Sequence, residues 1–229
     1  MKKVGLVGGI GPVSTLDYYT GIINGFRARA NDGNYPEIVI NSINMTEMLT
    51  YVANKDWDTL VNILLNAIQN LADAGAKIAA IASNTPHIVF DRVQKESKLP
   101  LISIVEATCK QVHAEGCKKI VVIGTRFTMS SGLYADAFRK FGIAAIVPSE
   151  DEQEVIHGII FPKLEDGIVV PEDKAKMLAI SNGLLANHHA DGLILGCTEL
   201  PLMIKDNDLD TLIFNTTQIH IEAIVDALF

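Results

Sequence analysis

The sequence predicts an α/β fold made of two pseudo-symmetric lobes, each a parallel sheet flanked by helices, with the site in the inter-lobe cleft. Short apolar runs alternate with longer segments of helical periodicity along all 229 residues, which is typical of parallel strands joined by helices. Two of these runs end in similar turns, KIAAIASNTPH at 77–87 and DGLILGCTELP at 191–201. Aligning them makes Ser83 the positional partner of Cys197.

Two further landmarks support a duplication. The apolar runs VGLVGGIGP and IVVIGTRFT end at Gly8 and Gly124. From Gly8 to Ser83 is 75 residues, and from Gly124 to Cys197 is 73. Near-equal offsets between two pairs of similar strand ends indicate a repeated α/β unit.

The first half shows the strand and helix pattern in order. Strands are expected at 3–7, 37–43 and 78–82, where short apolar runs are bounded by turn residues. A fourth strand is expected at 100–104, after the candidate crossover between the halves at 98–100. Helices are expected after the glycine-rich turn at 8–12 and across 56–75, where apolar residues recur at helical spacing. The first helical stripe consists of Leu16, Tyr19, Ile22, Ile23 and Phe26.

The second half repeats the alternation. Helices are expected near 105–114, 130–141, 152–165 and 171–188, and strands at 119–123, 143–147 and 211–214, besides the run before Gly196. Ser130 or Ser131 is the expected cap of the 130–141 helix. A closing helix from about residue 217 is expected to return to the first lobe. The predicted lobes are 1–98 plus 211–229, and 99–210.

Composition excludes several function classes. A net charge of −8 without a Lys/Arg cluster argues against nucleic acid and anionic membranes as partners, and favours a small molecule. The sequence nowhere contains eighteen consecutive apolar residues, so no membrane span is predicted. Three cysteines at 109, 117 and 197 lack disulfide-like spacing, which fits a reducing cytoplasm.

The usual cofactor motifs are missing. The turn at 8–12 has Ser14 where a dinucleotide fingerprint has its third glycine, and no acidic residue ends the next strand. No glycine-lysine pair of the P-loop kind, no C-x-x-C and no H-x-x-x-H occurs. We therefore expect no nucleotide, no metal and no other cofactor.

The two turns suggest one reaction class. Cys197 is expected between the end of a buried strand and the start of a helix, where N–H groups and the helix dipole favour a thiolate. Ser83 is expected at the equivalent point of the other lobe. Two such groups facing each other suit removal of a proton from one face of a carbon acid and its return to the other. Glu199 is interpreted either as a complement to the helix dipole or as a helper base for Cys197.

These motifs resemble one known family. SNTPH, GCTELP, IGT at 123–125 and the opening GLVGGIGP are similar to the aspartate/glutamate racemases, pyridoxal-independent enzymes of two α/β lobes that commonly form homodimers. The family typically has cysteine at both motif positions, whereas this chain has Ser83 in place of the first. The resemblance implies catalysis by Cys197 and Ser83. It also implies that substrate contacts come from Asn84, Thr85, Thr125, Thr198 and the Gly9–Ile10 backbone.

The side-chain pocket of the substrate is less typical. Aspartate racemases of this family carry basic residues after the second strand and before a glycine in the second lobe. This chain reads NSINMTEM at 41–48 and KLEDG at 163–167, with Lys163 and Arg126 as the nearest basic residues. Aspartate and glutamate are the expected substrates. Two alternatives stay open: a one-thiol decarboxylase or cis-trans isomerase of the same superfamily, and a dicarboxylate-binding or amino-acid-binding protein with weakened catalysis.

Overall fold

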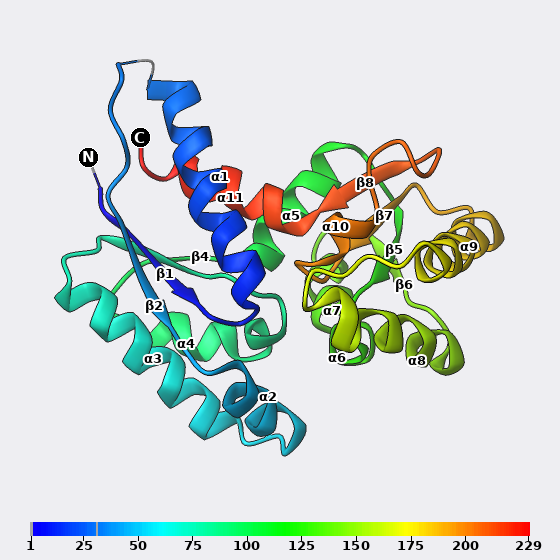
Figure 1. Cartoon of the computed structure of the whole chain (residues 1–229), viewed down its shortest axis with the longest axis horizontal. Helices are drawn as coiled ribbons and strands as arrows, with labels where there is room; N and C mark the ends of the chain where they lie inside the picture. Colours follow the sequence, from blue (N-terminus) through cyan, green and yellow to red (C-terminus); the bar gives the residue numbers. More distant parts are fainter. Residues whose placement is uncertain (1, 31) are drawn as a thin grey trace. The chain divides into compact units, whose positions relative to one another are not determined.

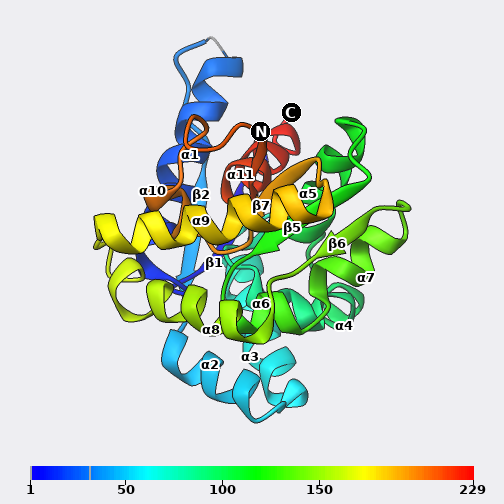
Figure 2. The same ribbon diagram turned by 90° about the vertical axis from the view of Figure 1, so that its right-hand side faces the viewer.

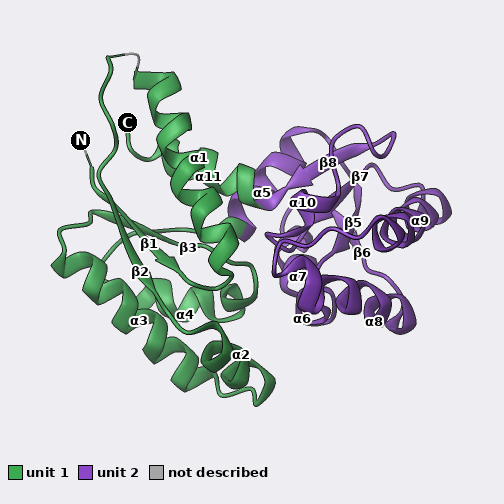
Figure 3. Ribbon diagram, in the orientation of Figure 1, with its two compact units in different colours: residues 1–104, 217–229 green, residues 105–216 purple. Residues whose placement is uncertain are grey.

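The computed structural model describes residues 2–30 and 32–229, so Met1, where the predicted first lobe begins, lies outside them. The chain divides into two compact units, coloured separately in Figure 3. The first unit comprises residues 1–104 and 217–229, and the second comprises residues 105–216.

Each unit is built on one four-stranded parallel sheet. The first sheet has the order β2-β1-β3-β4, from β1 (Val4–Gly8), β2 (Ile38–Ser42), β3 (Ile78–Ile81) and β4 (Leu101–Ile102). The second has the order β6-β5-β7-β8, from β5 (Lys119–Ile123), β6 (Ala144–Ile146), β7 (Gly192–Leu195) and β8 (Leu212–Asn215). All strand pairs are parallel. The predicted fold class is confirmed.

The two sheets have matching strand orders, so each strand of one has a counterpart in the other. Within this correspondence β3 matches β7. Ser83 lies two residues beyond the end of β3, and Cys197 lies two residues beyond the end of β7. The alignment of the two turns, made from sequence alone, therefore corresponds to equivalent positions in the two folds.

Helices connect the strands in both units (Figure 1). The first unit contains α1 (Pro12–Ala30), α2 (Met45–Ala53), α3 (Trp57–Asp73), the 3₁₀ turn η1 (Thr85–Val89), α4 (Phe90–Glu96) and α11 (Thr216–Asp226). The first residue of α11, Thr216, belongs to the second unit. The second contains α5 (Ile104–Ala114), whose first residue belongs to the first unit, α6 (Arg126–Ser130), α7 (Leu133–Arg139), α8 (Glu150–Ile159), the π turn η2 (Ile160–Leu164), α9 (Pro171–His188) and α10 (Leu200–Met203). Figure 2 shows α8 and α9 running alongside each other, and the two helices are in contact.

The two faces of β1 illustrate how the first core is assembled. Val4 and Leu6 point into a cluster with residues of α1 and α11, while a Cβ at Gly5 would lie 2.9 Å from the side chain of Leu71 on α3. Alternate residues of a strand face opposite sides of its sheet, so helices cover both faces. The C-terminal helix α11 is thus part of the first unit's core.

Helix α1 buries part of the expected stripe, since Ile22 and Phe26 are buried, but its buried face is rotated at the amino end. Leu16 and Tyr19 are 67% and 45% exposed, whereas Tyr18 and Ile22 are fully buried. The helical period was predicted correctly, but the polar Ser14 and Thr15 are also buried. Their hydroxyl groups are satisfied by the glycine turn: Thr15 Oγ1 accepts from Gly9 N at 2.9 Å, and Ser14 Oγ donates to Gly11 O at 2.9 Å.

The predicted lobe boundaries need correction. Strand β4 was assigned to the second lobe, but it pairs with β3 in the first sheet. The strand at 211–214 was assigned to the first lobe, but β8 pairs with β7 in the second sheet. Pairing partners are long-range contacts that local sequence patterns do not encode, and the chain crosses between the units after these strands rather than before them.

Two local predictions also differ from the structure. The expected 130–141 helix is two short helices, with Thr125 as the cap of α6 and Gly132, at φ 75°, preceding α7. Ser130 and Ser131 therefore end a helix instead of starting one. Helix α2 was not predicted, although Asn44 caps it by accepting from Thr46 N and Glu47 N.

Among the described residues, none of the helices combines the length and the apolar composition that a membrane crossing requires.

Candidate active site

The turn that carries Cys197 depends on two glycines. Gly196 N donates to Ile123 O at 2.7 Å, at the carboxyl ends of β7 and β5. A Cβ at Gly124 would lie 2.9 Å from Gly196 O, and one at Gly196 would lie 2.9 Å from Ile123 O. Backbones this close exclude any side chain, so glycine at both positions lets the ends of the two strands approach each other.

Cys197 is held by the residues that follow it. Its Sγ donates to Glu199 Oε2 at 2.9 Å, and Thr198 Oγ1 lies 2.9 Å from both carboxylate oxygens of the same glutamate. All three side chains are buried, with Cys197 6% and Glu199 3% exposed. Glu199 therefore accepts a hydrogen bond from the thiol, and its carboxylate lies where a helper base for Cys197 would have to be.

The electrostatics of this turn contradict one expectation. Burial, followed by the charge of Glu199, raises the pKa of the Cys197 thiol well above its ordinary value. A thiolate stabilised by a helix amino end was predicted, but α10 begins only at Leu200 and has four residues. So short a helix has little dipole, and the nearest charge is a carboxylate. Cys197 is consequently a thiol in the unliganded protein, with a base already in contact.

Sequence reasoning missed a third ionisable group at this turn. Glu165 directly follows η2, and a carboxylate oxygen of Glu165, Cys197 Sγ and a carboxylate oxygen of Glu199 all lie within 4.8 Å of one another. Burial, followed by the charges of Glu199 and Asp166, raises the pKa of Glu165 to about 7. The segment KLEDG had been considered only for its lack of basic residues, and nothing local in it indicates proximity to residue 197.

The Ser83 turn has a different chemical setting. Ser83 is partly buried, and its carbonyl oxygen accepts from His87 Nδ1 at 2.8 Å. Asn84 and Thr85, predicted to contact substrate, are 3% and 7% exposed at the start of η1. Ile10, also predicted to line the site, is buried in the turn between β1 and α1.

Two buried histidines fix the strand ends of the first unit. Ile104 N donates to His87 Nε2 at 3.3 Å, so the proton of His87 must be on Nδ1, which donates to Ser83 O. His220 Nε2 lies 2.9 Å from Ile102 O and must donate to it, while His220 Nδ1 accepts from Tyr18 Oη at 2.8 Å. Both rings are therefore neutral.

This histidine pair predicts acid sensitivity. Burial lowers the pKa of His87 to about 3 and that of His220 to about 4, from 6.5. The unfolded chain binds these protons below about pH 6.5 while the folded chain does not, so stability falls with falling pH down to about 4. Each histidine contributes up to about 1.4 kcal/mol per pH unit in that window. Urea unfolding between pH 7 and 4 measures this slope.

A matched pair of variants isolates the effect. His220→Gln should reduce the slope of unfolding free energy against pH by the contribution of one buried histidine, up to about 1.4 kcal/mol per pH unit. His113→Gln, which removes an exposed imidazole, should leave it as in the wild type. An equal slope in His220→Gln and wild type would contradict the assignment.

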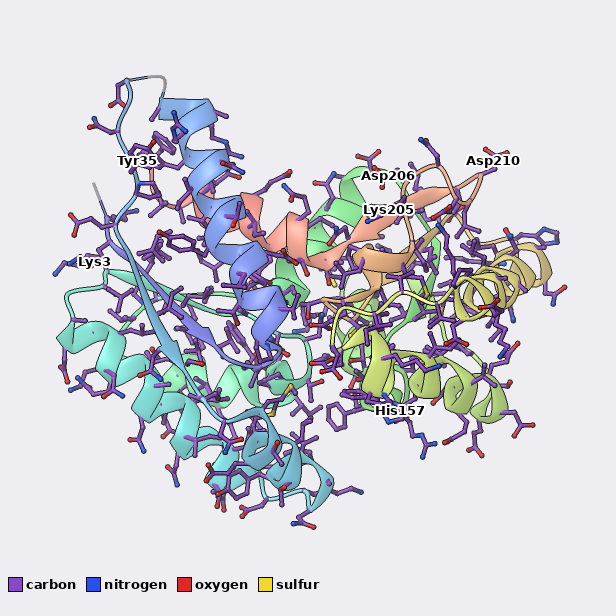
Figure 4. All side chains as sticks on the ribbon, in the orientation of Figure 1. Lys3, Tyr35, His157, Lys205, Asp206 and Asp210 are labelled. Atoms are coloured by element: carbon purple, nitrogen blue, oxygen red, sulfur yellow. The ribbon has the colours of Figure 1, made fainter. Side chains whose placement is uncertain are left out.

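The remaining predicted contact and the two basic residues lie in the second unit. Thr125 caps α6, where its Oγ1 accepts from Thr128 N at 3.3 Å. Arg126 forms an ion pair with Glu154, and its backbone N–H points to Nδ1 of His157, labelled in Figure 4, at 3.5 Å. Lys163 pairs with Asp173 at 3.6 Å. The charges of Arg126 and Lys163, the basic residues nearest to the positions where the family has its own, are therefore partly neutralised by acidic neighbours.

Glu165, Cys197 and Glu199 also form the single potential metal-ligand group found among residues 2–30 and 32–229. A cation there would have to displace the thiol proton that Glu199 accepts. The Cys197–Glu199 hydrogen bond accounts for the short distance between these two groups.

Comparison with known proteins places this geometry in context. A family model described as Asp/Glu/Hydantoin racemase matches residues 7–224. The chain belongs to this family. Its residues also show 26% identity over 204 positions to the broad specificity amino-acid racemase RacX of Bacillus subtilis (strain 168), covering 86% of this chain and 85% of that protein.

Solved structures agree with this racemase family assignment. An aspartate racemase homologue from Pyrococcus horikoshii OT3 has 36% sequence identity and a TM-score of 0.87, with 99% of both chains covered. The glutamate racemase of Aquifex pyrophilus is 31% identical over 65% of this chain, which spans only 56% of that enzyme. The family and its named members confirm the predicted function class, an isomerase that racemises amino acids.

Proposed function

We propose that this family member racemises an acidic amino acid without a cofactor, using Cys197 of the second unit and Ser83 of the first, one for each face of Cα. The observation that carries the proposal is the buried thiol of Cys197, hydrogen-bonded to a carboxylate at the end of β7. The equivalent position beyond β3, occupied by Ser83, supports the assignment of the second face.

The proton transfers balance as follows. The Cys197 thiol gives its proton to Glu199, and the sulfur then takes the proton from Cα, leaving a carbanion whose charge spreads into the substrate carboxylate. Ser83 supplies a proton to the opposite face and regains one from a water molecule. The hydroxide left behind is neutralised by the proton that the Cys197–Glu199 pair returns to solvent. The Cα–H bond that breaks on one side is thus replaced by one that forms on the other.

The predicted binding residues suit a carboxylate. Asn84, Thr85, Thr125 and Thr198 offer hydroxyl or amide donors, and all four lie in turns just after strands of their own unit. Donors directed at the substrate carboxylate would stabilise the charge that develops there during proton removal. We therefore assign these residues, with the Ile10 backbone, to substrate binding.

An acidic side chain is the proposed specificity. Its support is the Asp/Glu naming of the family and of similar proteins. Arg126 and Lys163 are the candidate cations, and each already has an acidic partner. A substrate carboxylate would compete with Glu154 or Asp173, so we propose weaker discrimination between aspartate and glutamate than a dedicated cation pair would give.

The decisive experiment follows Cα exchange. Protein dialysed against a chelator, with no pyridoxal phosphate added, is incubated in D2O with separate L and D samples of aspartate and glutamate. We expect deuterium at Cα and formation of the opposite enantiomer, detected by mass spectrometry and chiral chromatography. The two starting enantiomers should exchange at different initial rates.

Each alternative has a distinct signature in the same assay. Loss of the substrate without its enantiomer would indicate a decarboxylase or a cis-trans isomerase. A melting temperature raised by a dicarboxylate without any exchange at Cα would indicate a binding protein. Activity that returns only after a cofactor is added would contradict the proposed mechanism.

A further inference from the structure

Glu165 reaches the Cys197 turn through packing, not through sequence proximity. The preceding residue, Leu164, is fully buried in the second unit's core, and η2 contacts α10 directly after the cysteine turn. This anchoring brings the Glu165 carboxylate, the Cys197 sulfur and the Glu199 carboxylate within 4.8 Å of one another.

Exposure separates Glu165 from the other two. Cys197 and Glu199 are buried, whereas Glu165 is only partly buried and its neighbour Asp166 is exposed. Charges that act on Glu165 come from Glu199 and Asp166, both negative, and the nearby Lys163 is paired with Asp173. Glu165 is thus the carboxyl of this cluster with access to water.

A racemase with two different proton-transfer groups needs such access. After one turnover the Cys197 side holds the proton taken from Cα, and the opposite side has lost one. Before another molecule of the same enantiomer can react, Cys197 and Glu199 must return their extra proton to water. Both groups are almost fully buried, so a more exposed acid beside them would speed this return.

We propose that Glu165 is this carrier, a positioning and proton-exchange residue through which the Cys197–Glu199 pair equilibrates with solvent. The inference rests on the proposed function. Glu165 accepts the proton from the pair and releases it to water, while water replaces the proton lost on the Ser83 side, so that no net charge accumulates in the site. A carboxyl that titrates near neutral pH is suited to carry protons in both directions.

Kinetics can distinguish this role from a structural one. Return of the extra proton from the Cys197–Glu199 pair to water occurs in the free enzyme after product release. A slow return lowers kcat but not kcat/KM, because kcat/KM describes only the steps from free enzyme and substrate to the first irreversible event. In Glu165→Gln we expect kcat to fall about tenfold or more while kcat/KM changes less than about threefold. Glu165→Asp, which retains a carboxyl, should recover much of kcat.

Asp166→Asn is the matched control, because it removes an adjacent negative charge from an exposed position outside the cluster and leaves the two larger causes of the raised Glu165 pKa, burial and Glu199, in place. Its kcat and kcat/KM should both remain near the wild-type values. With Cα-deuterated substrate in H2O, Glu165→Gln should also retain deuterium in the unreacted enantiomer longer than Asp166→Asn does. Equal kinetics and equal deuterium retention in the two variants would overturn the inference while leaving the racemase function intact.

A second readout is independent of turnover. Thiolate absorbance against pH, with Cys197→Ala as the blank, reports ionisation of Cys197 directly. Removing the charge at position 165 should shift thiolate formation to lower pH than in Asp166→Asn. Failure of wild-type Cα exchange would refute the proposed function, whereas an unchanged thiolate titration in Glu165→Gln would refute the coupling of Glu165 to Cys197.

Discussion

Cys197→Ala should lower the racemisation rate by at least about a thousandfold, since it removes the proton-transfer group of one face. The fold should survive, because removing one sulfur atom from a buried side chain costs about 1 kcal/mol. Chiral chromatography of aspartate and glutamate measures the loss of activity, and circular dichroism melting measures stability.

Cys117→Ala provides the control for this prediction. Cys117 is a free, buried thiol in the same unit, before the amino end of β5, whereas Cys197 follows the carboxyl end of the parallel neighbour β7. Its substitution should leave the racemisation rate within a few-fold of the wild type. A Cys197→Ala protein that melts normally and still racemises at the wild-type rate would rule out Cys197 as the catalytic thiol.

Ser83→Cys should raise the exchange rate of the slower enantiomer by about tenfold or more, because a thiol is a far stronger acid than a hydroxyl. In the wild type, the Cys197 face has a carboxylate in contact to take its proton. The Ser83 face has a neutral His87 whose two ring nitrogens are already engaged by backbone groups. Proton removal should therefore start more easily on the Cys197 face.

The measurement is the initial rate of deuterium incorporation into separate L and D samples. Ser83→Ala is the matched variant, since it lacks both hydroxyl and thiol, and it should widen the difference between the two enantiomers. The overall equilibrium must favour neither enantiomer in any variant. Equal initial rates in the wild type, unchanged in Ser83→Cys and Ser83→Ala, would exclude the side chain at 83 from the proton path.

The sequence by itself determined the fold class, the alternation of strands and helices, and the equivalence of the two turns. These features are local: an apolar run of four or five residues followed by glycine or a small residue specifies a buried strand and its end. Helix α9 was predicted at 171–188 and observed at Pro171–His188 because Pro171 begins it. Likewise, Ser83 and Cys197 could be paired because both follow their strands by the same number of residues.

Only the tertiary structure decided which sheet contains β4 and β8, and which form of Cys197 predominates. Sheet membership depends on pairing between strands far apart in the chain, such as β7 with β8. The protonation of Cys197 depends first on burial and on contact with Glu199, and to a smaller extent on Glu165, which lies 32 residues earlier in the sequence and is brought close by the packing of Leu164. Desolvation and charge proximity are properties of the folded chain, so no local pattern around residue 197 reveals them.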